Sequence, residues 1–523
     1  MKVLKHPLML GFGLGLGYLV YSQFPDLVTR LAFGLIAFFG WVFLYAVVCS
    51  DRADILSEVL RFGPLAWNER DLAHVLILGQ TRRGKTSSGL AQIIHQISRA
   101  FPNWGGLVLG VKNTEHEFYR AHFAGTGRED QLIVLQVRGN DHPENWNPPA
   151  RINLTGDRRI PHAGYAKMLV DAAKSLSGEG GNPFWADTAQ QLFTLGFELL
   201  DKLGRPYTIP ELYLALTDTS RLQTLLMELR DDHEDDPRAE RIYNELDSQL
   251  ISSDAKDQLE GTRGTLKQYL GFFMHPDIYR VFCSEEPTCS IGEMDYGKIF
   301  CTSIPQHFPT ERRYIHTVLK QLAYYHGMMR FDKEAERQGH IAGSNHLFLV
   351  FDEAQDVITA SETGMSDHTV LDRIGGAKVH VIFSMQSAAS PESKIRRDAT
   401  RNLINHFSTR LYFQLGDEEE AIAAAKFIGQ TKKRRERKSY NLVGVGGLPI
   451  IGPAGKSVDY GESYEVPPVA FLRLDQHQAV VLHPTKRWHV MDVPALDPKG
   501  NRERWWRPAG AWRVRRLIRQ SYR

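Results

Sequence analysis

A glycine-rich run from Gly79 to Ser87 carries the residue types that bind phosphate groups. It follows the short apolar segment 74–78, which is typical of a strand, and it precedes a helical pattern that continues to Ala100. Glycines let the backbone turn tightly enough for its N–H groups to surround phosphate oxygens, and the helix dipole adds positive charge. The sequence therefore predicts a nucleotide-binding loop. Its expected nucleotide contacts are Gly79, Gln80, Thr81, Arg82, Arg83, Gly84, Lys85, Thr86 and Ser87.

Two carboxylates lie far downstream, at the end of the apolar run 346–351. We expect Asp352 to hold Mg²⁺ together with the hydroxyl of Thr86, and Glu353 to polarise the water that attacks ATP. Lys85 is expected to act as a catalytic residue that binds the β- and γ-phosphates. An acidic pair after an apolar run is common by itself, so its meaning depends on the phosphate loop. Together the two motifs predict an ATPase with ATP and Mg²⁺ at its site.

A third apolar run, 379–384, leads to the polar residue Gln386. We predict that Gln386 senses the γ-phosphate or its water, the alternative being a surface glutamine without a role. A positive charge from a neighbouring subunit would stabilise the transferring phosphoryl group. The candidates for that charge are Arg373, Lys378, Arg401 and Arg410. The pattern does not choose among them, and we take Arg373 as the working candidate.

The elements that must position these residues form an α/β nucleotide-binding core in two parts, 51–161 and 281–485. Between them, residues 162–280 show apolar residues at spacings of three and four, which predicts an inserted all-α domain. Residues 486–523 are predicted to form a basic, aromatic C-terminal tail.

The first 50 residues depart from the composition of a soluble protein. Two apolar runs, 8–21 and 31–49, predict a transmembrane hairpin of two helices over residues 1–50. Lysines precede the first run and Arg52 follows the second, so the positive-inside rule places both ends in the cytoplasm. A cleaved signal peptide is the alternative, but no small-residue cleavage site precedes the second run. We therefore predict a multi-pass membrane protein whose bulk is cytoplasmic.

The net charge of the 523-residue chain is only +2, so attraction to nucleic acid must come from local basic clusters. One cluster is Lys432–Lys438, in an expected loop or hairpin. The other is 505–523, where Trp505, Trp506 and Trp512 lie among arginines. This mixture suits phosphate contact and base stacking, but also a membrane surface or an acidic protein partner. The four cysteines show neither metal-ligand spacing nor a disulfide framework.

The order of these features resembles the type IV coupling proteins of bacterial conjugation and secretion, the TraD/TraG-type ATPases, over most of the chain. The chain departs from the family at Val111-Lys112, where the family usually has an acidic residue before the lysine. Besides the motifs above, the resemblance rests on Trp146-Asn147-Pro148, Asn182-Pro183-Phe184-Trp185 before the helix with Ala189, Gln386-Ser387, Arg401-Asn402 with Asn405, the strand 410–414 and the alanine-rich segment 417–429.

The resemblance implies an α/β fold with a RecA-like P-loop NTPase core, an inserted all-α domain and an N-terminal transmembrane helical hairpin. It implies a homo-hexamer in the bacterial inner membrane that recruits DNA with a relaxase or other relaxosome proteins. The partners would include DNA, the membrane and the inner-membrane components of a type IV secretion channel. ATP hydrolysis would drive DNA through that channel. Two alternatives stay open: a receptor for protein effectors at such a channel, and an FtsK/HerA-like DNA translocase.

Overall fold

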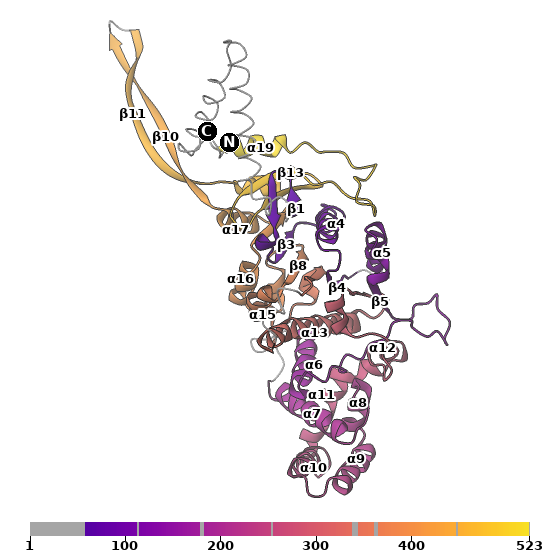
Figure 1. The fold of residues 1–523 in the computed structure, drawn as a ribbon. Coiled ribbons are helices and arrows are strands. Elements are labelled where there is room, and N and C mark those ends of the chain that lie inside the picture. Colours follow the sequence, from indigo (N-terminus) through magenta and orange to yellow (C-terminus); the bar gives the residue numbers. More distant parts are fainter. Residues whose placement is uncertain are drawn as a thin grey trace, which may run out of the picture. The chain divides into compact units, whose positions relative to one another are not determined.

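The chain divides into two compact units, Met1–Leu72 and Ala73–Arg523, a division that falls inside the predicted segment 51–161. The predicted transmembrane hairpin, residues 1–50, lies outside the described residues, and so does Lys112. The computed structural model describes residues 58–111, 114–177, 183–252, 255–336, 344–359, 365–445 and 448–521 (Figure 1).

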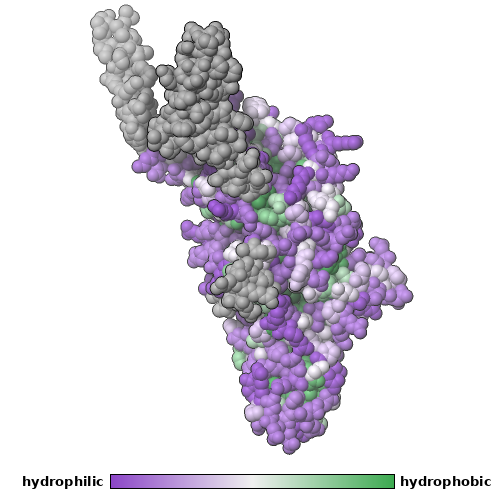
Figure 2. All heavy atoms as spheres, in the orientation of Figure 1, coloured by the Kyte–Doolittle hydropathy of each residue, from purple (hydrophilic) through white to green (hydrophobic). Residues whose placement is uncertain are grey.

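Within these ranges, no helix combines the length and the apolar character that crossing a bilayer requires. Figure 2 shows one face of the molecule, where hydrophilic residues dominate the coloured surface and hydrophobic ones are scattered among them. The two predicted membrane spans therefore stay a prediction.

The described part of the first unit is a small antiparallel sheet of β1 (Glu58–Phe62) and β2 (Leu65–Asn68). The buried rings of Phe62 and Trp67 meet edge to face, with centroids 5.9 Å apart. A reciprocal capping contact between Asn68 and the short helix that follows ends the second strand.

The second unit is built on a nine-stranded sheet of order β13-β12-β9-β3-β8-β7-β4-β6-β5. Its strands are β3 (Val75–Leu78), β4 (Gly105–Leu109), β5 (Leu132–Gln136), β6 (Ile299–Ser303), β7 (Leu347–Asp352), β8 (Val379–Met385), β9 (Thr409–Tyr412), β12 (Gln478–Leu482) and β13 (Trp488–Asp492). The strands from β9 to β5 in this order are parallel, whereas β12 and β13 extend one edge as antiparallel strands. The segments that follow β3, β7 and β8 therefore meet at one edge of the sheet, where ligands of open α/β sheets bind.

The central strands β3, β4, β6, β7 and β8 are buried at every residue. Continuous apolar runs of this kind are expected where helices cover both faces of a parallel sheet. The predicted α/β core is therefore confirmed. Among the described residues, the α-helices outside the inserted domain are α4 (Ala91–Ala100), α5 (Glu115–Gly125), α13 (Pro309–Glu336), α15 (Asp367–Ile374), α16 (Arg397–Asn405), α17 (Glu418–Ile428), α18 (Pro468–Leu472) and α19 (Trp512–Ser521).

Between β5 and β6 the described chain forms a group of helices that spans 162–282, where the sequence predicts an all-α domain at 162–280. They are α6 (His162–Ser177), α7 (Pro183–Lys202), α8 (Ile209–Thr217), α9 (Thr219–Asp232), α10 (Pro237–Leu250), α11 (Lys256–Leu270) and α12 (Pro276–Phe282). Figure 1 shows these helices beyond α13, which contacts both α6 and strand β4.

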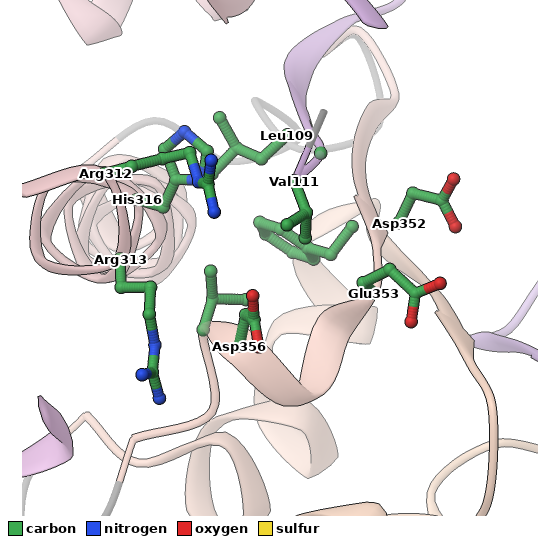
Figure 3. A pocket seen from close by; sticks show the side chains of 11 residues that line it. Leu109, Val111, Arg312, Arg313, His316, Asp352, Glu353 and Asp356 are labelled. Atoms are coloured by element: carbon green, nitrogen blue, oxygen red, sulfur yellow. The ribbon is translucent and has the colours of Figure 1, made fainter. Parts of the chain in front are cut away.

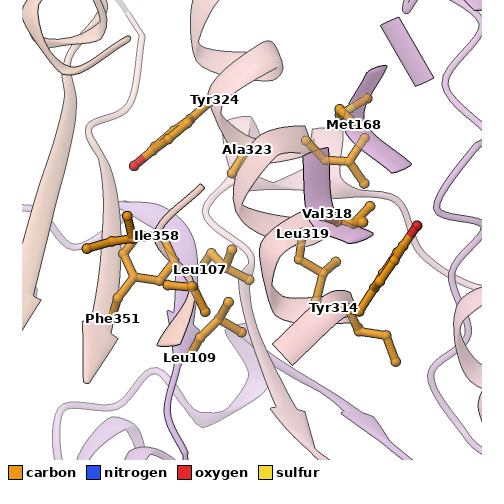
Figure 4. Close-up of a cluster of buried hydrophobic side chains, with 14 of the residues drawn as sticks. Leu107, Leu109, Met168, Tyr314, Val318, Leu319, Ala323, Tyr324, Phe351 and Ile358 are labelled. Atoms are coloured by element: carbon orange, nitrogen blue, oxygen red, sulfur yellow. The ribbon is translucent and has the colours of Figure 1, made fainter. Parts of the chain in front are cut away.

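Helix α13 joins the helical group to the sheet through one continuous apolar core. Figure 4 shows Leu319 of this helix between Met168 of α6 and Leu109 of β4, with Tyr314 of the same helix to the side, and all four residues are buried. The hydroxyl group of Tyr314 donates a hydrogen bond to the carbonyl of Leu169 at 2.6 Å. The inserted helices are therefore anchored on the same core that supports the sheet.

A buried ion pair supports the segment that follows β7. The Lys320 ammonium lies 2.7 Å from both carboxylate oxygens of Asp367, and both side chains are buried. Burial lowers the pKa of Lys320, and the Asp367 carboxylate opposes that shift. The same ammonium donates to the carbonyl of Val357, and Asp367 accepts the Thr359 N–H at 2.9 Å. The pair thus ties α13 and α15 to the chain just after the acidic motif.

We expect Asp367→Asn to lower the free energy of unfolding by about 3–5 kcal/mol, because it leaves the Lys320 charge buried without a partner. Urea unfolding of the full chain measures this change. The control is Asp372→Asn on the same helix, whose exposed carboxylate should matter by no more than about 0.5 kcal/mol. Equal effects of the two variants would contradict the prediction.

Two long strands, β10 (Gln430–Val445) and β11 (Leu448–Tyr464), pair only with each other in an antiparallel sheet within the described chain. Figure 1 shows them as an extended ribbon. The basic run Lys432–Lys438 lies in β10, so the expected loop or hairpin is a hairpin.

Residues 486–523 are predicted as a basic tail, but the described part, 486–521, contains regular structure. They contribute β13 to the main sheet, and α19 follows. Val490 and Trp506 are buried, and the Arg515 guanidinium donates to the carbonyl of Val490 at 2.7 Å. The reason for the difference is that apolar residues between the arginines share one face of each element and bury it.

Candidate functional site

The glycine-rich loop lies between β3 and a π-helical turn at Lys85–Leu90 that continues into α4. The backbone φ angles of Gly79, Arg82 and Gly84 are 152°, 63° and 106°. A Cβ atom on Gly84 would lie only 2.6 Å from Nδ1 of His477. Glycine is therefore required at this position both by backbone conformation and by space.

The ammonium group of Lys85 is held inside this loop. It donates hydrogen bonds to the carbonyl oxygens of Gly79 at 2.7 Å and of Gln80 at 3.3 Å, and the residue is buried. The strand, the loop and the first helical turn thus place one positive charge where the loop closes. This is the position from which the predicted contact with the phosphates would be made.

Thr86 and Asp352 come together from distant parts of the chain, because β3 and β7 end at the same edge of the sheet. The Thr86 hydroxyl donates a hydrogen bond to Oδ2 of Asp352 at 2.8 Å. The other carboxylate oxygen, Oδ1, is buried and forms no hydrogen bond with the described chain. A hydroxyl and a carboxylate are the oxygen ligands that suit Mg²⁺, so these residues fit the predicted ion.

Glu353, the residue after Asp352, has a left-handed backbone with φ of 55°. Such a conformation is uncommon for residues other than glycine and is found repeatedly at active sites. Its Oε2 accepts a hydrogen bond from Gln355 at 2.7 Å and lies 3.5 Å from Nε2 of Gln386. The structure therefore brings the predicted water-activating carboxylate and the predicted sensor side by side.

A small cavity of about 10 Å³ lies beside β7 and is lined by Arg312, Arg313 and His316 of α13 (Figure 3). It has the room of about one water molecule. Burial and the nearby Arg312 lower the pKa of His316 to about 3, so its ring is neutral and the arginines carry the positive charge. In Figure 3 the carboxylates of Asp352 and Glu353 point away from these arginines. The arginines thus lie next to the acidic motif, on the side away from its carboxylate groups.

Comparison with known proteins places this site in a family context. Residues 346–452, which include Asp352, Glu353 and Gln386, match the family described as the TraM recognition site of TraD and TraG. The predicted similarity to type IV coupling proteins is confirmed. A search of curated protein sequences gives no match.

Solved structures of a coupling protein share the fold. The unbound bacterial conjugative coupling protein TrwBdeltaN70 superposes with a TM-score of 0.55 at 14% identity, covering 83% of this chain and 88% of that chain. The plasmid coupling protein TrwB in complex with ADP and Mg²⁺ gives a TM-score of 0.57 at 13% identity, covering 85% and 92%. The chain thus shares its fold with the coupling protein TrwB.

Within this coupling-protein fold, the four candidates for a trans-acting charge differ in surroundings. Arg410 is buried, donates to the carbonyls of Phe407 and Ile404, and lies over the ring of Phe427 at 3.2 Å. Its guanidinium is therefore held by contacts within the chain, which argues against the predicted contribution to a neighbouring subunit. The side chain of Arg373, at the end of α15, is 64% exposed, and its role in trans stays a prediction.

Several residues around the site were not predicted from the sequence. Gln355 donates a hydrogen bond to Glu353, which lies only two positions before it. An amide residue so close to the acidic motif is a sequence signal from which this contact could have been predicted. Arg312 and Arg313 lie about 40 residues before the motif in the chain, and no local pattern marks them. His477, in the turn before β12, contacts the glycine-rich loop through its backbone N–H, which donates to the carbonyl of Arg83.

Proposed function

We propose that this chain is an inner-membrane ATPase that recruits a DNA–relaxase substrate to a type IV secretion channel and drives DNA transfer by ATP hydrolysis. The observation that carries the proposal is the contact of Thr86 with Asp352, beside the loop that holds the charge of Lys85. TrwB structures are described in complex with ADP and Mg²⁺ and with a non-hydrolysable ATP analogue. We propose ATP and Mg²⁺ for this chain as well.

In this mechanism Lys85 and the N–H groups of residues 79–87 bind and orient the phosphates of ATP. Thr86 and Asp352 would hold Mg²⁺, which supplies positive charge against the phosphate oxygens when bound. Glu353 accepts a hydrogen bond from the attacking water and polarises it. The water oxygen bonds to the γ-phosphorus and gives up a proton to Glu353 while the bond to the bridging oxygen breaks, and ADP and phosphate leave. Gln386 orients the γ-phosphate or the water.

The proposed assembly is a homo-hexamer at the bacterial inner membrane, with residues 1–50 as the membrane hairpin and the bulk of the chain in the cytoplasm. The exposed side chain of Arg373 supports a contribution to the site of a neighbouring subunit. Relaxosome proteins and the inner-membrane components of the channel are the proposed partners. The match of residues 346–452 to a TraM recognition family supports contact with a relaxosome.

The hairpin of β10 and β11 is the proposed DNA contact. Six of the seven residues in Lys432–Lys438 are basic. Because successive residues of a strand alternate between its two faces, Lys433, Arg435 and Arg437 share one face, and Lys432, Arg434 and Lys438 share the other. The pairing of the two strands is regular over this run, so the two faces provide separable tests.

We expect DNA binding to weaken when the three basic residues on the face that contacts DNA are replaced by glutamine. The dependence of binding on salt concentration should also decrease. For duplex DNA, removing a single ionic interaction with a phosphate should reduce the slope of log K against log salt by about 0.9. The triple variant of the other face is the matched control, because it removes the same charge from the same hairpin. If both variants keep the slope of the unmodified protein, the hairpin is not the DNA contact.

The test of the proposed function is ATP turnover by the purified full-length chain, with and without single-stranded and double-stranded DNA. Stimulation by DNA supports a DNA-driven motor. ATP turnover that is indifferent to DNA would favour a receptor for protein cargo instead, and absence of turnover would contradict an ATPase.

A further inference from the structure

The order of strands determines which way a nucleotide lies in the proposed site, and the inference here rests on that proposed function. Glu353 and Gln386 follow β7 and β8, which lie to one side of β3. Strands β9, β12 and β13 lie to the other side. A nucleotide with its γ-phosphate toward Glu353 would extend its nucleoside end toward β9 and β12. The groups on that side are therefore the candidates for contact with the base.

His477 stands on that side, immediately before β12. Its backbone N–H donates to the carbonyl of Arg83 at 3.0 Å, and its Nδ1 lies 2.7 Å from the hydroxyl oxygen of Ser88. Its φ of 62° is uncommon for a residue other than glycine. Burial lowers the pKa of its ring, which favours the neutral imidazole. His477 is thus held beside the turn that begins α4, by its backbone at Arg83 and by its imidazole at Ser88.

The segment after β13 returns to the same place. The N–H of Leu496 donates to the carbonyl of Ser87, which belongs to the phosphate loop, at 3.2 Å. Backbone contacts between residues 495–496 and 502–503 close this segment into a loop. The loop is therefore held by regular contacts over the start of α4, and side chains that follow it have a defined position.

Trp505 is the side chain that this loop presents. Its ring centroid lies 5.3 Å from that of His477, at an interplanar angle of 53°. The residue is 57% exposed, whereas its neighbour Trp506 is only 4% exposed. A large aromatic ring that is fixed by its backbone but left open to solvent beside a phosphate loop has the properties of a stacking surface.

We propose that Trp505 is the stacking platform for the purine base of the nucleotide, and that His477 is the positioning residue that fixes it beside the loop. Trp505 contributes an apolar face that any purine can cover. His477 links the ring of Trp505 to the loop that binds the phosphates, so base and phosphates are recognised as one unit. Trp505 thereby makes the site bind nucleotides more tightly than phosphate compounds that lack a base.

The experiment compares two ligands, ATP and inorganic tripolyphosphate, by titration calorimetry on the full-length protein. Tripolyphosphate has the phosphate chain but no base. Because Trp505→Ala removes one base-stacking interaction, it should weaken ATP binding about 5- to 100-fold and leave tripolyphosphate binding unchanged. Trp505→Phe keeps an aromatic face, so it should retain most of the affinity for ATP.

Trp512→Ala is the matched control, because Trp512 is 59% exposed and lies in the same C-terminal segment. It should leave both ligands unaffected. If Trp505→Ala weakens ATP and tripolyphosphate binding equally, its role is structural and the proposal is overturned, as it would be by an unchanged affinity for ATP. An unmodified protein that binds neither ligand would overturn the proposed nucleotide site itself, and the inference with it.

Discussion

Glu353→Gln is expected to reduce ATP turnover by about 10²–10⁴-fold, the range for removal of a group that assists proton transfer. The amide keeps the size of the side chain and can still contact Gln355, but it cannot polarise water as a carboxylate does. Binding of ATP should persist, because the phosphate contacts assigned to Lys85 and the loop are unchanged. Steady-state turnover together with an equilibrium binding assay measures both parts of this expectation.

The control for this variant is Glu392→Gln, which removes an exposed carboxylate from the segment that follows β8. Turnover should stay at the level of the unmodified protein there. If Glu353→Gln also keeps that turnover, the strained backbone of Glu353 has a purpose other than activating water, and the assignment is wrong.

Lys85→Ala should abolish most turnover by a different route, because it removes the charge that lies inside the loop. Removing one group that stabilises transition-state charge costs about 10²–10³-fold in rate. Affinity for ATP should fall as well, in contrast to Glu353→Gln, because the ammonium is proposed to bind phosphates in both the ground state and the transition state. Turnover and ATP affinity of the purified variant provide the check.

Lys85→Arg is the informative companion variant. It keeps the positive charge but replaces a compact ammonium by a planar guanidinium that does not fit the contact with the Gly79 carbonyl. We expect it to fail as Lys85→Ala does. Full turnover by the alanine variant would contradict the role assigned to Lys85, and with it the proposed ATPase site.

The motifs that the sequence determined by itself are local. The strand, loop and helix around Lys85 are contiguous, and the apolar run before Asp352 and Glu353 is a single strand, so short-range periodicity was enough to predict them. The inserted helices at 162–282 were predictable for the same reason, because their apolar spacing of three and four residues is an internal property of each helix.

The tertiary structure alone decided which distant residues meet these motifs. His477 reaches the phosphate loop because β12 pairs with β9 beside β3, and Trp505 packs against His477. The guanidinium of Arg410 is buried on Phe427, which argues against its predicted role in trans. The predicted tail folds because its apolar residues find partners on the sheet edge. Strand pairing and burial of this kind depend on contacts between separate elements, and in the pairing of β3 with β9 between residues hundreds of positions apart, so no local pattern encodes them.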